Sequence, residues 1–181
     1  MRKWLRVAVM FFAGTVSACA FAHGKHVHGE AEMNVAVDGN DLTVEMQGPL
    51  GNFLGFEHAP QDEKQKKALV DMTAALHEAR ELIVPNSDAA CSYVSGRVAL
   101  KKGAKTVHPV MLKSLAGKDG DGHVDLVASW SWYCEKPESL KTVRLPLFAR
   151  FPGLERVDAQ VLLPKKQVAA SATPQKPVLS W

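Results

Sequence analysis

Apolar residues occupy every second position in two neighbouring segments, residues 33–37 and residues 42–46. Between the segments lies the turn-forming sequence Asp38-Gly39-Asn40-Asp41. Side chains two positions apart in a strand point to the same face of a sheet. The pattern therefore predicts a β-hairpin with one buried face.

Residues 61–84 carry a helical pattern instead. Apolar residues recur there at spacings of three or four, at Leu69, Met72, Leu76, Ala79 and Ile83. Pro60 precedes the segment, Asp62 and Glu63 suit a helix amino terminus, and Pro85 ends the pattern. The spacing predicts one long amphipathic helix over about residues 61–84, whose apolar stripe packs against a core.

Most of the remaining chain alternates as a strand does. The predicted strands cover residues 91–100, 123–134, 143–147 and 157–163. Because these strands cluster instead of alternating with helices, the predicted class is α+β with a mainly antiparallel sheet. The sequence indicates a single α+β domain over residues 31–164. Residues 165–181 are expected to form a polar connection followed by a short terminal strand.

The amino terminus has the three-part layout of a secretory signal peptide. Arg2, Lys3 and Arg6 precede an apolar run over residues 7–16, and small residues follow as far as Ala22. The apolar run is far shorter than the roughly 20 residues of a membrane-spanning helix. We therefore expect residues 1–22 to be a signal peptide and the mature protein to be exported to the cell envelope.

Three processing sites fit this leader. Ala20-Phe21-Ala22 favours cleavage before His23, which leaves a histidine-rich lead over residues 23–30. Ala18-Cys19-Ala20 also satisfies the small-x-small rule. Val16-Ser17-Ala18-Cys19 resembles a lipobox, which would lipidate Cys19 and tether the protein to a membrane. Membrane contact is expected only in that last case.

The charge balance excludes one class of partner. The chain has 22 Lys+Arg and 19 Asp+Glu residues, a formal net charge of +3, and Arg2, Lys3 and Arg6 leave with the signal peptide. A neutral mature protein lacks the positive charge that binding to nucleic acid requires. The sequence also lacks a G-x-S-x-G, a G-x-G-x-x-G and a phosphate-binding loop, so nothing in it supports nucleophilic catalysis.

Two cysteines, Cys91 and Cys134, are left for pairing in the mature chain. An even number in an oxidising compartment predicts a disulfide. The alternative is a thiol metal or redox site, although no C-x-x-C sequence is present.

The histidine-rich lead holds the first candidate metal ligands. His23, His26 and His28 fall within six residues, and His26 and His28 would share one side of an extended segment. Imidazole suits zinc, copper and nickel. Cleavage before His23 would add its α-amine as a chelating group. The alternative is a solvated tail in which these histidines bind no metal.

A second group of candidates precedes the predicted helix. His58 lies in a tight loop, and Glu57 or Glu30 could supply an oxygen ligand beside it. A lone loop histidine that hydrogen-bonds the backbone is the structural alternative.

Further candidates lie in and beside the loop-like stretch over residues 101–122. Asp119, Asp121 and His123 could hold zinc, and His108 lies in the same stretch. The spacing lacks the glycine and the closing glutamate of an EF-hand, so a calcium loop of that kind is excluded. A polar surface loop without ligands is the alternative.

Several segments resemble the zinc-regulated periplasmic protein family of Gram-negative bacteria. Residues 26–37, which begin His-Val-His-Gly-Glu, and residues 55–60, Gly-Phe-Glu-His-Ala-Pro, are similar to its amino-terminal half. Residues 123–126, 132–134 and 147–153 are similar to its carboxyl-terminal half. The resemblance implies a periplasmic zinc-binding accessory protein in zinc acquisition, storage or homeostasis. It also implies zinc as the bound ion, a zinc-uptake transporter component as a partner, and no enzymatic activity.

The chain departs from that family in one place. Members carry a long histidine- and aspartate-rich insert where residues 101–122 offer only His108, Asp119 and Asp121. This leaves the histidines of the lead, with His58 and His123, as the zinc ligands that the resemblance implies. Two other functions fit the residues: a copper-binding envelope protein that uses a freed His23, and a metal-independent envelope interaction protein.

Overall fold

The computed structural model describes residues 27–103, 105–108 and 123–181. Within these residues, ten strands form two sheets. The strands are β1 (Glu30–Asp38), β2 (Asp41–Pro49), β3 (Val84–Pro85), β4 (Cys91–Lys102), β5 (Lys105–Val107), β6 (Asp125–Cys134), β7 (Thr142–Arg144), β8 (Arg156–Leu163), β9 (Lys166–Ala172) and β10 (Val178–Ser180). The helices are α1 (Gly51–Leu54), α2 (Glu63–His77) and α3 (Leu147–Arg150). Single 3-10 turns cover Ala79–Glu81, Ser87–Ala89 and Pro137–Ser139.

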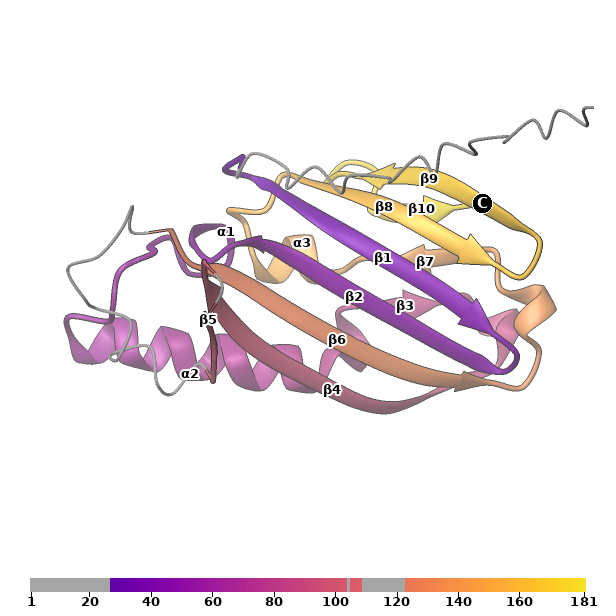
Figure 1. The fold of residues 1–181 in the computed structure, drawn as a ribbon, viewed down its shortest axis with the longest axis horizontal. Helices are drawn as coiled ribbons and strands as arrows, with labels where there is room; N and C mark the ends of the chain where they lie inside the picture. Colours follow the sequence, from indigo (N-terminus) through magenta and orange to yellow (C-terminus); the bar gives the residue numbers. More distant parts are fainter. Residues whose placement is uncertain (1–26, 104, 109–122) are drawn as a thin grey trace, which may run out of the picture.

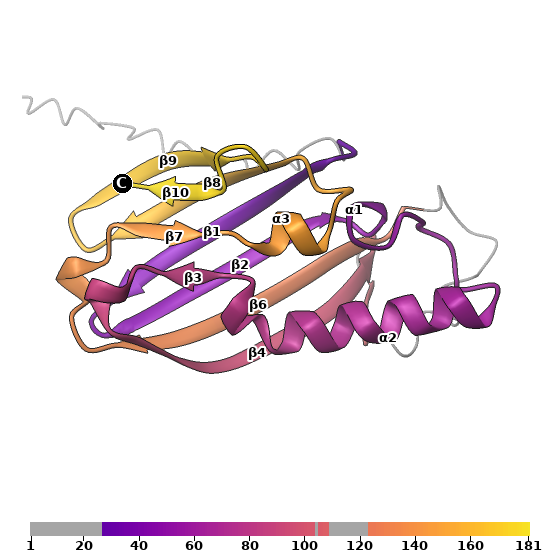
Figure 2. The ribbon, with the colours of Figure 1, turned by 180° about the vertical axis from the view of Figure 1, so that it is seen from behind.

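The two sheets pack as layers (Figure 1). The large sheet has seven strands in the order β5-β4-β6-β2-β1-β8-β9, and the small sheet has three in the order β10-β7-β3. Figure 2 shows that the three helices and the small sheet lie on the same face of the large sheet. Alternate residues of β1, β2 and β6 are buried against these elements, which explains the period of two in the sequence.

The predicted hairpin is confirmed. β1 and β2 pair antiparallel, with Asp38 opposite Asp41 at the turn. β1 also pairs with β8, in parallel, and places Glu30 opposite Arg156. All other neighbouring strands of both sheets are antiparallel. The parallel pair brings the start of the described chain beside residue 156.

The α+β prediction with a long amphipathic helix over residues 61–84 is wrong. The described residues are mainly β, and α2 ends at His77. Its amino terminus is capped by the Asp62 side chain, which accepts a hydrogen bond from Gln65 N at 2.7 Å. At the other end, Glu78 leaves the helical conformation with φ −107° and ψ 49°. Ala79 and Ile83 are still buried, so the apolar spacing continues beyond the helix because burial continues.

Three polar contacts fix the carboxyl end of α2 on the large sheet. The Trp130 Nε1 donates to Leu76 O at 2.6 Å, and the Tyr93 hydroxyl donates to His77 O. The His77 Nδ1 lies 3.1 Å from Gly96 O. A Cβ atom on Gly96 would lie 2.7 Å from both His77 O and Trp130 Cδ1, so only glycine fits this close approach.

Two further predictions concern the strands and the cysteines. The polar connection expected at residues 165–177 instead contains β9, which pairs with β8 as the edge of the large sheet. The side chains of β9 that face inward are valine and alanine, and because they are small they give only a weak apolar pattern in the sequence.

The predicted disulfide between Cys91 and Cys134 is confirmed, with an S–S distance of 2.02 Å. It joins the first residue of β4 to the last residue of β6.

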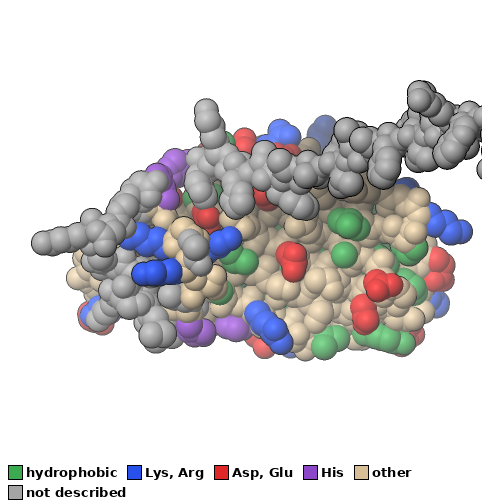
Figure 3. All heavy atoms as spheres, in the orientation of Figure 1, with side chains coloured by type: hydrophobic (Ala, Val, Ile, Leu, Met, Phe, Trp, Pro, Cys, Tyr) green, Lys and Arg blue, Asp and Glu red, His purple; other side chains and the backbone are tan. Residues whose placement is uncertain are grey.

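A search of the described residues for membrane-spanning helices finds none of sufficient length and apolar character. Figure 3 shows Lys and Arg side chains gathered at the left of this face of the large sheet, near β5, whereas the other coloured charged side chains are scattered.

Candidate metal centre

The strand order brings three chain segments together at one end of the large sheet. β2 lies between β1 and β6 and runs antiparallel to both, so β1 and β6 begin where β2 ends. His28 lies just before β1, His123 lies just before β6, and α1 follows β2. Gly55 then closes α1 in the left-handed conformation, with φ 77°. The loop that leaves α1 carries Glu57 to this end of the sheet.

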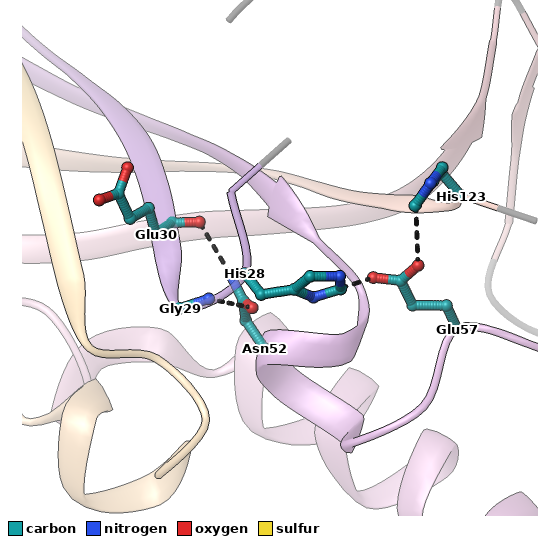
Figure 4. Close-up of polar contacts among 6 residues, drawn as sticks. All are labelled: His28, Gly29, Glu30, Asn52, Glu57 and His123. Carbon is teal, nitrogen blue, oxygen red and sulfur yellow. Dashed lines mark hydrogen bonds and ion pairs between the residues drawn. The ribbon is translucent and has the colours of Figure 1, made fainter. Parts of the chain in front are cut away.

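Glu57 lies between the two histidines (Figure 4). Its Oε2 is 3.1 Å from the His123 Nδ1, and its Oε1 is 3.7 Å from the His28 Nδ1. The Glu57 side chain is 18% exposed, whereas those of His28 and His123 are 72% and 48% exposed. The Glu57 Oε1 is buried and has no hydrogen-bond partner. A buried carboxylate oxygen without a donor is costly unless a cation compensates it.

Asn52 of α1 fixes the position of His28. The Asn52 side chain is buried, and its Oδ1 accepts from Gly29 N at 2.8 Å. Its Nδ2 donates to Glu30 O at 2.8 Å. One side chain thus ties the start of β1 to α1 and satisfies one backbone group of Gly29, just before β1, and one of Glu30, its first residue.

The distances around Glu57 can be compared with those between two ligands of one zinc ion. Nitrogen and oxygen ligands lie about 2.0–2.1 Å from tetrahedral zinc, so two ligand atoms of one ion are about 3.3 Å apart. The 3.7 Å separation at His28 is near that value, whereas the 3.1 Å contact is a hydrogen bond in which the His123 Nδ1 donates to the Glu57 Oε2. The Nε2 of His123 is therefore the atom of that ring able to bind a metal. Within the described residues, however, no group of three His, Cys, Asp or Glu side chains converges as a complete metal site. We call Glu57, His28 and His123 the Glu57 group. This group would therefore need a further ligand or a small rearrangement to enclose an ion.

A pocket of about 310 Å³ opens beside this group. Its walls include the side chains of His28, Phe56, Glu57 and Glu155. Gly51 also lines it, and a Cβ atom at that position would lie 3.1 Å from the Glu57 Oε1. The absence of a side chain at Gly51 therefore leaves room for the carboxylate.

His58 makes structural contacts. Its Nδ1 lies 2.9 Å from Ala59 O, and its ring stacks on Phe56 with the ring centroids 5.1 Å apart. Because the carbonyl can only accept, the Nδ1 is the donor, and the Nε2 of the neutral ring is left as the atom able to bind a metal. Its role as a ligand stays a prediction.

The other predicted ligands are dispersed. Glu30 contributes its backbone carbonyl to Asn52, and its side chain is exposed at the start of β1. His108 is exposed just after β5. His23, His26, Asp119 and Asp121 lie outside the described residues.

Glu155 is a candidate that the sequence alone did not reveal. It shares the pocket with His28 and Glu57, although it lies far from both in the sequence. No local motif marks it, because it reaches the pocket through the parallel pairing of β1 with β8.

The fold and the Glu57 group define a mainly β protein with a carboxylate–histidine candidate metal centre. A family model described as ZrgA family zinc uptake protein matches residues 25–181, and the chain belongs to this family. The match confirms the resemblance to a zinc-related family seen in the sequence. The description links the family to zinc uptake and names no enzymatic reaction. A search of curated proteins finds no match.

Proposed function

We propose that this protein is a periplasmic accessory protein that binds zinc at the Glu57 group and serves zinc acquisition or storage. The observation that carries the proposal is the partly buried Glu57 carboxylate, with a histidine nitrogen on each side and one oxygen without a hydrogen bond. The membership of a zinc uptake family supports zinc as the ion. The signal-peptide pattern of residues 1–22 supports a periplasmic location.

The geometry favours exchangeable binding. Structural zinc sites are closed by four protein ligands, whereas sites that react or exchange keep an open position. Here the two histidines are exposed and a pocket adjoins Glu57. An ion held in this way remains accessible to a transporter component or another acceptor.

Calorimetric titration of the metal-free protein beginning at His23 tests the proposal, with copper(II) as a parallel titrant. We expect sub-micromolar zinc binding, and loss of that binding when His28→Ala and His123→Ala are combined. Unchanged zinc affinity in the double variant would rule out the Glu57 group as the site. Much tighter binding of copper than of zinc would instead support a copper protein.

His58→Ala is the matched comparison among the histidines. Because the His58 Nδ1 hydrogen-bonds to Ala59 O and its ring stacks on Phe56, its removal should leave zinc affinity within a few-fold of the parent. A loss as large as that of the double variant would show that the loop rearranges to use His58 as a ligand.

A further inference from the structure

Glu155 lies on the wall of the pocket beside His28. The backbone N–H groups of Glu155 and Arg156 both donate to Gly29 O, at 2.7 Å and 2.9 Å. A Cβ atom on Gly29 would lie 3.2 Å from the Glu155 Oε2, so this carboxylate passes directly over the residue after His28. Two backbone hydrogen bonds and a glycine therefore hold Glu155 at the pocket.

The charges around the pocket favour a cation. Glu57 and Glu155 both line it, and among the described residues that form its walls there is no lysine or arginine. The neighbouring Arg156 is directed elsewhere, because its guanidinium pairs with both oxygens of Asp158 at 2.8 Å. A cleft lined by one sign of charge focuses the electric field and raises the local concentration of the opposite ion.

The position of Glu155 separates its role from that of Glu57. Glu57 is largely buried between two histidines, whereas Glu155 is exposed at the pocket. A carboxylate in that position can attract a hydrated ion without entering its inner coordination shell.

We propose that the pocket is the route by which a hydrated divalent cation reaches Glu57, and that Glu155 is the outer carboxylate that captures it. The inference rests on the proposed zinc function and adds the direction of access. Glu155 is a positioning residue for the incoming ion. Removal of its charge should slow association and leave dissociation unchanged, as is typical of a charge at the rim of a binding site.

Zinc kinetics on the full mature protein test this role. The dissociation rate is measured by stopped-flow transfer of zinc to an excess of a strong chelator, and the association rate follows from that rate and the calorimetric Kd. In Glu155→Gln we expect association about 3–10-fold slower at low ionic strength, with Kd weakened by the same factor. The difference should shrink in 0.5 M salt because mobile ions screen the charge.

Glu138→Gln is the matched control. Glu138 is an exposed glutamate in the Pro137–Ser139 turn, beyond the opposite end of β6, and the substitution removes the same charge. It should leave both rates unchanged. Equally slow zinc association in both variants would mean that the effect comes from the net charge of the protein and would overturn the proposal.

Two other results would also overturn it. Faster dissociation in Glu155→Gln, with a changed absorption spectrum of the cobalt(II)-loaded protein, would make Glu155 an inner-shell ligand. Unchanged rates would mean that the ion enters elsewhere. Both results require that the parent protein binds zinc, so a parent that binds none would refute the proposed function itself.

Discussion

The two ends of strand β6 differ in how completely their polar groups are satisfied. At the carboxyl end, Cys134 is buried in the disulfide with Cys91, and its carbonyl accepts from the Asn40 Nδ2 at 2.7 Å. At the amino end, exposed His123 lies beside Glu57, whose Oε1 has no hydrogen bond. Buried polar atoms in folded proteins are almost always paired, so this exception supports the proposal of an ion at Glu57. The same strand thus carries stability at one end and the candidate metal centre at the other.

Removal of the disulfide should have the largest effect on stability, and it tests whether the two ends of β6 act independently. The bond closes a loop with a sequence separation of 43, which corresponds to about 4 kcal/mol of stabilisation on a loop-entropy estimate. Urea unfolding of the Cys91→Ala, Cys134→Ala double variant should show a loss of that order in the free energy of unfolding. The zinc affinity of the folded fraction should not change. A weakened zinc affinity would show that the two ends of β6 are coupled.

Gly96→Ala should also act on stability alone, at about 3 kcal/mol. The added methyl group would meet the backbone oxygen of His77 and the ring of Trp130, which itself hydrogen-bonds to Leu76 O, so relief of the clash must disturb the packing of α2 on the large sheet. Thermal unfolding followed by circular dichroism would measure the loss. A Tm equal to that of the parent would mean that the end of α2 is more loosely packed than the structure indicates.

Glu57→Gln should have the opposite effect to the two preceding changes, because it should weaken metal binding and not stability. The substitution keeps the shape of the side chain and removes its charge, and we expect zinc affinity to fall about 10–100-fold, or 1.4–2.7 kcal/mol. The free energy of unfolding should change little, because the Glu57 Oε1 has no hydrogen bond to lose and the glutamine amide oxygen can still accept the hydrogen bond from the His123 Nδ1. Calorimetry and urea unfolding of the same preparation test both parts. A large loss of stability would contradict the assignment of Glu57 to the site.

Tyr93→Phe should have the smallest effect, about 1 kcal/mol, because it removes the hydrogen bond to His77 O. Burial raises the pKa of Tyr93 above its ordinary value of 10.0. The folded state therefore holds this proton more tightly than the unfolded chain, and that contribution to stability is lost as the pH rises above about 10. Urea unfolding between pH 8 and pH 11 should show a decline in the parent that is smaller in the variant. Equal declines in the parent and the variant would mean that groups other than Tyr93 cause the loss of stability at high pH.

The sequence predicted the hairpin and the disulfide because their signals are local or depend on few residues. The end of α2 could not be predicted in this way, since Ala79 and Ile83 keep the helical spacing after the helix has ended. β9 was missed because Val168, Ala170 and Ala172, its inward residues, carry little apolar surface. A zinc-related family was predicted from the lead and from residues 55–60. The pairing of Glu57 with His28 and His123, and the place of Glu155, depend on strand order.

The parallel pairing of β1 with β8 has a consequence for how the protein folds. Glu30 finds Arg156 across more than a hundred intervening residues, and this contact holds His28 and Glu155 at the same pocket. Contacts of such high sequence separation slow folding, because a long loop must close before they form. The outer edge of β1 therefore cannot pair with β8 until the last quarter of the chain is available. Until then Glu155 is missing from the pocket beside Glu57, so we expect the proposed zinc site to be complete only in the finished chain.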